Sequence, residues 1–191
     1  MSGNRNPVKE ARRNALLKVL SDRWGFVETE KRLPGIIVPD FKNPSSINPL
    51  LKEVLKNIQA TRNREVQGKK DLQLPFDYYL PQIGVLVEFD ETQHFSKLRA
   101  IALRSYPSQV KIGFDKNRWI SLAEEIQAKD NDPLYRDEQR AFYDSVRDIL
   151  ATLLGFKPVV RIFQDDVRWE EGDTTSTNAK SFLAKIEELS R

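Results

Sequence analysis

Cysteine is absent from this chain of 191 residues, and histidine occurs only once, as His94. The first absence excludes disulfide bonds and thiolate metal sites, and the second excludes a zinc site built from several histidines. The sequence also lacks an apolar run of the roughly 18 residues that a membrane span needs. Its start does not resemble the apolar core of a signal peptide, so we expect a cytoplasmic protein without a membrane partner.

Charged residues, by contrast, are abundant. They make up 31% of the chain, and hydrophobic residues make up 39%, which suits one domain with a packed core and a charged surface. The formal net charge of +3 and the pI near 9.0 favour a polyanionic partner weakly. Basic residues cluster ahead of the central motif at Arg62, Arg64, Lys69 and Lys70. Such a cluster is either a solvated surface or a segment that contacts phosphates.

Helical and extended patterns alternate along the chain. Amphipathic spacing predicts helices over 7–20, 49–60, 96–106, 133–154 and 174–189, and apolar or aromatic runs predict strands over 74–80, 85–90 and 158–163. Residues 24–38 indicate a short strand with turns, and residues 110–132 show no clear pattern. The segment 40–48 is the best candidate boundary, between an N-terminal helical extension (1–48) and a main domain (49–191), although one continuous domain is the alternative. The order predicts an α/β fold with a central mixed sheet of about four or five strands flanked by helices.

Acidic residues interrupt the most apolar of these strands. Glu88 and Asp90 lie two residues apart in the run Val85–Asp90, so their side chains share one face of the strand. A four-residue turn separates this run from the strand that carries Asp77, and an antiparallel hairpin would bring Asp77 beside Glu88. Buried acids that lack partners are costly, so this grouping requires a compensating cation.

Two kinds of cation satisfy that requirement. Three carboxylates offer the hard oxygen ligands that Mg²⁺ or Mn²⁺ prefers, and such a metal ion can promote phosphodiester hydrolysis. The alternative is a set of ordinary strand-end carboxylates that face water or pair with Arg104 or Arg161. The spacing alone does not choose between the two.

The same residues carry a resemblance to a known family. Phe76 and Asp77, followed by Val-Glu-Phe-Asp-Glu-Thr-Gln-His-Phe at 87–95, resemble the motif of the PD-(D/E)XK nucleases. The similarity is to the group with very-short-patch repair endonucleases and several restriction and nicking enzymes, whose strand ends Glu-x-Asp-Gly-x-x-His. Residues 137–140 resemble that group's Asp-x-x-Lys helix, and residues 159–162 resemble its following strand.

The resemblance covers about residues 74–166 and implies a restriction-endonuclease-like core. It also implies a DNA endonuclease that uses Mg²⁺, with Mn²⁺ as a substitute, and leaves a 5′-phosphate. Asp77 and Glu88 would be metal ligands, and Asp90 would stand where the name-giving motif has lysine. Glu91 replaces the usual glycine, a departure that can alter the turn after the strand.

The missing lysine leaves its function to another side chain. His94 matches the terminal histidine of the motif, and either orients water and phosphate or serves only as a packing residue. Gln93, Lys97 and Arg140 are the other candidates for this polar or positive function.

These arguments give a definite set of expectations. The expected catalytic residues are Asp77, Glu88, Asp90, Gln93 and His94, with the first three as metal ligands, and the expected nucleic-acid contacts are Arg62, Arg64, Lys69, Lys70 and Lys97. The expected partners are DNA and, for double-strand cleavage, a second copy or a second subunit. Two alternatives remain: a DNA-binding or assembly subunit that keeps the fold without cutting, and a structural protein whose acidic hairpin is incidental.

Overall fold

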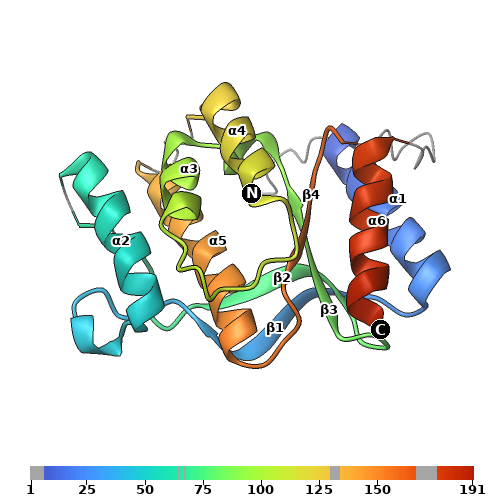
Figure 1. Ribbon diagram of the computed structural model, residues 1–191, viewed down its shortest axis with the longest axis horizontal. Helices are drawn as coiled ribbons and strands as arrows, with labels where there is room; N and C mark the ends of the chain where they lie inside the picture. The colour runs from blue at the N-terminus through green and yellow to red at the C-terminus, as the bar shows by residue number, and fades with distance from the viewer. Residues whose placement is uncertain (1–6, 64, 67, 130–133, 167–175) are drawn as a thin grey trace.

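The computed structural model describes residues 7–63, 65–66, 68–129, 134–166 and 176–191. A sheet of four strands in the order β1-β2-β3-β4 lies at the centre of this part of the chain (Figure 1). The strands are β1 (Glu28–Ile37), β2 (Gln73–Leu80), β3 (Val85–Asp90) and β4 (Val160–Phe163). β2 is antiparallel to both β1 and β3, whereas β3 and β4 are parallel. The expectation of an α/β protein with a mixed sheet flanked by helices is confirmed, with four strands.

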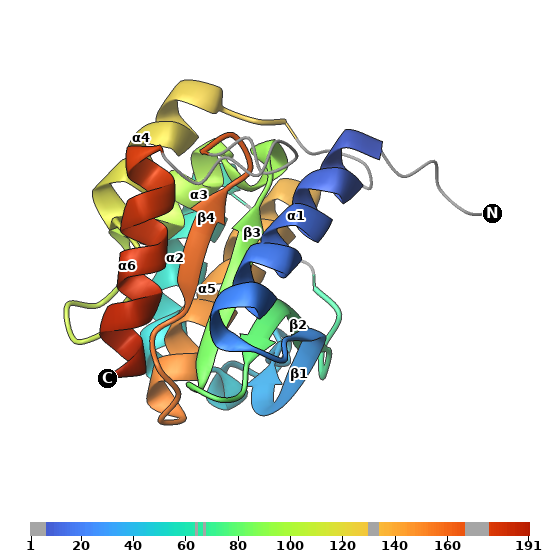
Figure 2. The same ribbon diagram turned by 90° about the vertical axis from the view of Figure 1, so that its right-hand side faces the viewer.

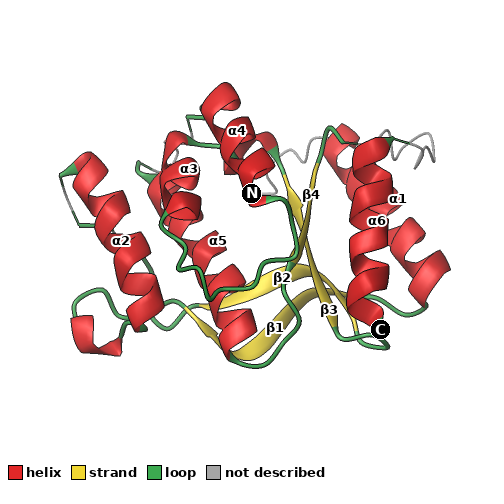
Figure 3. Cartoon of the chain, viewed as in Figure 1, coloured by secondary structure: helices red, strands yellow, loops and turns green. Residues whose placement is uncertain are grey.

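Helices cover both faces of the sheet, as Figures 1, 2 and 3 show. One face carries α1 (Pro7–Trp24) and α6 (Thr177–Ser190), and the other carries α2 (Pro49–Arg62), α3 (Lys97–Arg104), α4 (Lys116–Ile126) and α5 (Arg136–Leu153). Short 3₁₀ turns, η1 (Pro44–Ser46) and η2 (Thr92–His94), lie between elements. Parallel β3 and β4 need a crossover connection, and α3, α4 and α5 provide it.

Side-chain caps explain where several helices begin. Asn48 accepts a hydrogen bond from the backbone N–H of Leu50, and Pro49 occupies the first turn of α2. Ser96 caps α3 and Asp115 caps α4 in the same way. α4 lies within residues 110–132. The sequence showed no clear pattern there because the buried side of α4 consists of few residues.

The predicted N-terminal range is part of the same sheet. β1 pairs with β2 from Glu28 opposite Tyr79 to Ile37 opposite Gln73, with an irregularity after Arg32. Within residues 24–38, where a short strand and turns were predicted, Glu28–Ile37 form one long, irregular strand. α1 packs against β2–β4 through apolar side chains, Leu16 and Leu20 among them. Described residues of both predicted ranges thus belong to the same sheet and to the apolar clusters on both of its faces.

Several element boundaries differ from the sequence-based expectation by a few residues, including those of α5 and β4. The helix expected from Pro133 begins at Arg136 in the described chain, and residues 130–133 lie outside the described residues. β4 begins at Val160, two residues after the predicted start at Pro158, which as a proline donates no backbone hydrogen bond. Neither difference moves the acidic residues of β3.

The alternation of side chains along β3 decides where its acids lie. Val85, Val87 and Phe89 pack into the apolar layer under α1 and α6. Glu88 and Asp90 alternate with these residues along the strand, so they point to the face covered by α5. All six residues of β3 are buried, so both acids meet protein groups rather than bulk water.

Candidate active site

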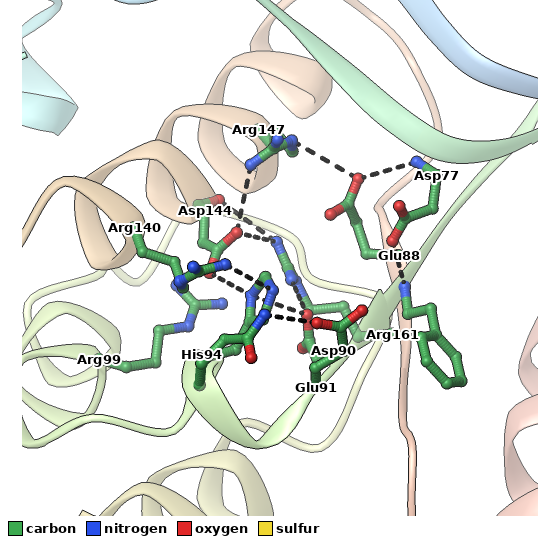
Figure 4. Close-up of polar contacts among 12 residues, drawn as sticks. Asp77, Glu88, Asp90, Glu91, His94, Arg99, Arg140, Asp144, Arg147 and Arg161 are labelled. Carbon is green, nitrogen blue, oxygen red and sulfur yellow. Dashed lines mark hydrogen bonds and ion pairs between the residues drawn. The ribbon is translucent and has the colours of Figure 1, made fainter. Parts of the chain in front are cut away.

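The β2–β3 hairpin separates at Asp77 and Glu88. Regular pairing runs from Leu80 opposite Val85 to Tyr78 opposite Val87 and then stops. Beyond that point side chains replace the backbone ladder: the N–H of Asp77 donates to Glu88 Oε1 at 3.3 Å, and the N–H of Phe89 donates to Asp77 Oδ2 at 2.8 Å. The two carboxylates thus occupy the place where the strands diverge (Figure 4). The expected proximity of Asp77 and Glu88 is confirmed.

The charge of these two acids is only partly balanced. Asp77 Oδ1 accepts a hydrogen bond from Arg13 Nη1 of α1 at 2.7 Å. The closest guanidinium to Glu88 is that of Arg147 on α5, with Nε 3.5 Å from Oε1. Burial raises the pKa of Glu88 to about 8, with Arg147 opposing this shift and the negative charge of Asp77 adding to it. Glu88 is therefore an acid that keeps its proton to a higher pH than an exposed glutamate does.

Asp90 lies on the same face of β3 but has a full set of partners. Its Oδ1 accepts from Arg161 Nη1 and its Oδ2 accepts from Trp119 Nε1, each at 2.6 Å. The ion pair with Arg161, one of the alternatives raised by the sequence, is present. Within the described residues, no group of three or more acidic or histidine side chains is arranged to hold a metal ion. The expected convergence of Asp77, Glu88 and Asp90 is therefore corrected: Arg161 and Trp119 turn Asp90 away from the other two.

Arg161 belongs to a buried ion network between β4 and α5. Its guanidinium lies 2.9 Å from Asp148 Oδ1 and 3.7 Å from Asp144 Oδ1. Asp148 also accepts hydrogen bonds from Arg99 and Tyr106, at 3.0 and 2.8 Å. Burial makes an unpaired charge very unfavourable. Each of these charged side chains therefore needs the others as partners in order to remain buried.

His94 contacts residues of this ion network rather than Glu88. Its Nδ1 lies 3.0 Å from Asp144 Oδ2 and 3.4 Å from Asp90 Oδ1, and its Nε2 lies 3.3 Å from Arg140 Nη1. Burial alone would raise the pKa of Asp144, but His94 and Arg161 outweigh that effect and hold the pKa well below its usual range. Asp144 is thus a stable anion that orients the imidazole ring (Figure 4).

Arg147 connects the two groups. Its Nη1 lies 3.2 Å from Asp144 Oδ1, its Nε donates to the carbonyl of Pro75 at 2.8 Å, and the same Nε is the atom closest to Glu88. A fixed guanidinium therefore stands between the Asp77–Glu88 pair and His94. The structure places a cation beside the acids, although not at the position of the motif lysine.

Glu91, where the resembling group has glycine, anchors α1. This buried carboxylate lies 2.6 Å from Lys9 Nζ and 3.1 Å from Arg13 Nη2. Gln93 donates its side-chain N–H to Glu91 as well, so it does not contact Asp77 or Glu88 in the described contacts. Arg13 thereby bridges Glu91 and Asp77.

The expected nucleic-acid contacts do not form one patch with common properties. Arg62 is paired with Asp137, with Nη2 2.6 Å from Oδ2. Lys69, Lys70 and Lys97 are exposed, and Lys70 lies 3.5 Å from Asp40. Arg64 lies outside the described residues. The lysines are accessible to a polyanion, whereas Arg62 has an internal partner.

Sequence reasoning did not single out Asp144, Arg147 or Arg13 as part of the site. The sequence did contain a signal for Asp144. This residue lies on one helical face with Asp137, Ala141 and Asp148, and all four are buried. Acids on the buried face of an amphipathic helix demand partners, which here are arginines. Arg13 gave no such signal, because α1 and β2 are distant in the sequence.

Comparisons with protein-family models, with curated proteins and with solved structures found no match to this chain. None of the helices in the described part of the chain combines the length and the apolar character that crossing a lipid bilayer requires.

Proposed function

We propose that the chain is a metal-dependent DNA endonuclease with a restriction-endonuclease-like core, in which Asp77 and Glu88 hold Mg²⁺ or, as a substitute, Mn²⁺. The observation that carries this proposal is the separation of β2 from β3 at two apposed carboxylates whose charge is incompletely balanced. The order of hairpin, helix and parallel strand also agrees with the resemblance described above.

The residues fit a magnesium ion by their chemistry. Mg²⁺ is commonly bound by one or two carboxylates, with water and substrate phosphate completing its octahedral shell, so two acids suffice. The ion would supply charge stabilisation at a phosphoryl oxygen and activate water for attack. A bound cation would favour the ionised form of Glu88 and so lower its raised pKa.

The remaining residues have separate tasks in this proposal. Attack of water on phosphorus breaks the P–O3′ bond and leaves a 5′-phosphate and a 3′-hydroxyl. Arg147 adds positive charge beside Glu88, the function for which no motif lysine exists. Asp144 holds the His94 ring, so His94 can orient phosphate or exchange a proton with water. Asp90 is a positioning residue that acts through Arg161 and His94.

One observation favours a second candidate, a DNA-binding or assembly subunit that does not cut. Arg13 donates to Asp77, and Arg147 lies beside Glu88, so arginines already supply part of the charge that a metal ion would supply. In that case DNA binding would persist without any dependence on divalent metal. Double-strand cleavage by the nuclease would require a second copy or subunit.

Cleavage of supercoiled plasmid across a Mg²⁺ series separates the two functions. We expect metal-dependent nicking or linearisation by the wild type and by Glu125→Gln, a matched change on the exposed side of α4. Asp77→Asn and Glu88→Gln should abolish cleavage and retain most DNA binding. Near-normal cleavage by either site variant would refute the assignment, and DNA binding without cleavage by the wild type would favour the second candidate.

A further inference from the structure

The guanidinium of Arg13 bridges two acids, Asp77 in β2 and Glu91 just after β3. Its Nη1 donates to Asp77 Oδ1 at 2.7 Å, while its Nε and Nη2 both donate to Glu91 Oε1, at 3.3 and 3.1 Å. The same guanidinium lies over the ring of Phe89, 5.2 Å from its centroid. Arg13 belongs to α1, on the face of the sheet opposite to α5, as Figure 2 shows. A cation therefore reaches Asp77 from the face that does not carry Arg147.

The two oxygens of Asp77 have different partners. Oδ2 accepts the backbone N–H of Phe89 at 2.8 Å, which holds it between β2 and β3. Oδ1 is the oxygen that accepts from Arg13. A metal ion that binds Asp77 would have to share this carboxylate with the guanidinium, and like charges repel strongly at short range in a partly buried site. Arg13 thus neutralises the carboxylate that a metal ion would need.

Glu91 gives Arg13 a place to remain if the contact with Asp77 is lost. Two of the three hydrogen bonds that the guanidinium donates go to Glu91, a side chain that is only 4% exposed. Release of Asp77 would therefore leave Arg13 paired, whereas an unpaired buried charge would be very unfavourable. The exchange of Arg13 for another cation on Asp77 costs one hydrogen bond and leaves the ion pair with Glu91 intact.

We infer that Arg13 sets the metal affinity of the Asp77–Glu88 pair: it neutralises Asp77 in the metal-free protein and is retained by Glu91 when a divalent cation takes its place. The inference rests on the proposed function, because it requires that the pair binds such a cation. Coupling of this kind is reciprocal, so the contact between Arg13 and Asp77 is weakened by metal as much as metal binding is weakened by Arg13. α1 is then part of the metal site although it contributes no ligand.

Calorimetric titration of the whole chain with Mn²⁺ tests this inference without cleavage. We expect Arg13→Gln to bind Mn²⁺ about tenfold more tightly than the wild type, which is within the usual range for coupling between two sites. Arg23→Gln removes one positive charge from an exposed ion pair of the same helix, with Glu187, and should leave the affinity unchanged. Glu88→Gln should abolish binding, which would show that the heat comes from the carboxylate pair.

Glu91→Gln separates competition by Arg13 from a general loosening of α1. This variant also removes a contact of α1, but it leaves Arg13 with Asp77 as its acidic partner among the described residues. Competition predicts that the affinity for Mn²⁺ does not rise in Glu91→Gln. Loosening of α1 predicts that it rises as in Arg13→Gln.

Hydrogen exchange of the wild type provides a second measurement that needs no variant. Saturating Mg²⁺ should speed amide exchange in the segment of α1 around Arg13, because the contact with Asp77 is lost when metal binds. Exchange in β3 should become slower under the same conditions. Unchanged or slower exchange in α1 would contradict the inference.

Each remaining outcome decides a different point. Equal affinity of the wild type and Arg13→Gln, or an equal rise in Glu91→Gln, would overturn the inference and leave the proposed metal site intact. Absence of Mn²⁺ binding by both the wild type and Arg13→Gln would overturn the inference and the proposed function together. Tighter binding by Arg13→Gln without plasmid cleavage would keep the inference while the endonuclease proposal fails. Circular dichroism checks that each variant is folded, and the exchange measurement decides if Arg13→Gln is not.

Discussion

Glu88 and Asp90 lie two residues apart on the same buried face of β3, yet their surroundings differ. Asp90 has Arg161 and Trp119 on its two oxygens, each at 2.6 Å. Glu88 has a backbone N–H at 3.3 Å and a guanidinium at 3.5 Å, next to the second acid Asp77. The partners of Asp90 fix its carboxylate in place, whereas burial beside a second acid raises the pKa of Glu88. We expect the partners of Asp90 to stabilise the fold, and we propose that the metal ion is held beside Glu88.

The largest expected effect comes from breaking the Asp90 region. Arg161→Met removes the cation that pairs with Asp90 and Asp148 and leaves buried carboxylates without it. We expect the free energy of unfolding to fall by about 3–5 kcal/mol, the usual cost of leaving a buried charge unpaired. Urea denaturation measures this, with the exposed Arg23→Met as the control. A loss below about 1 kcal/mol would show that the network contributes little.

The second prediction asks whether the Asp90 region contributes to cleavage. His94→Ala should lower the single-turnover rate by about 10², the usual effect of removing a positioned acid–base group. The magnesium concentration for half-maximal rate should stay unchanged, because His94 contacts Asp90 and Asp144 rather than the Asp77–Glu88 pair. A near-normal rate would make His94 a packing residue and would direct attention to Arg140, Arg147 or Lys97.

The third prediction concerns the unfavourable charge of Glu88 without metal. The folded-state pKa of Glu88 is raised to about 8, above that of the unfolded chain, so the unfolded state loses its proton first as the pH rises. Between about pH 5 and pH 8, Glu88 should therefore ionise in the unfolded chain but keep its proton in the folded state. The free energy of unfolding of the wild type should fall progressively over this range. Glu88→Gln should remove this pH dependence and raise the free energy of unfolding at pH 8 by ~2 kcal/mol.

Urea unfolding in EDTA at both pH values provides the measurement, with Glu125→Gln as the matched control. Added Mg²⁺ should restore stability at pH 8 to the wild type and not to Glu88→Gln. If the wild type and Glu88→Gln have the same pH dependence, Glu88 is ionised without penalty and the contrast with Asp90 disappears.

The smallest effect extends the same comparison to the basic segment before β2. Arg62 and Lys69 are both exposed, but Arg62 forms an ion pair with the buried Asp137. We expect Lys69→Gln to weaken DNA binding and to reduce the slope of log affinity against log salt by roughly one. Arg62→Gln should leave the slope unchanged. Anisotropy titrations over a KCl series would contradict this if Arg62 proved to be the residue that sets the slope.

The fold was largely predictable, because it follows from local patterns. The turn at 81–84 between two apolar strands predicts the hairpin, and Asn48 with Pro49 marks the start of α2. The pairing of Asp77 with Glu88 follows from that hairpin. The sequence left the surroundings of Asp90 open between a metal ion and Arg161, and it did not predict the second partner, Trp119, which comes from an element more than 25 residues away. Strand alternation predicts the face of the sheet on which a side chain lies, but it does not predict which groups of other elements the side chain contacts on that face.

The contacts between α1 and Glu91 bear on the order in which the molecule assembles. Arg13 reaches Glu91 across 78 positions of the sequence and Asp77 across 64. During synthesis α1 is made before either acid, and its apolar docking surface includes β4 and α6, which are made after both acids. Contacts of such long range form slowly, since distant segments must first be brought together. The acidic site therefore reaches its final form only after the whole sheet is complete, and an unfinished chain lacks it.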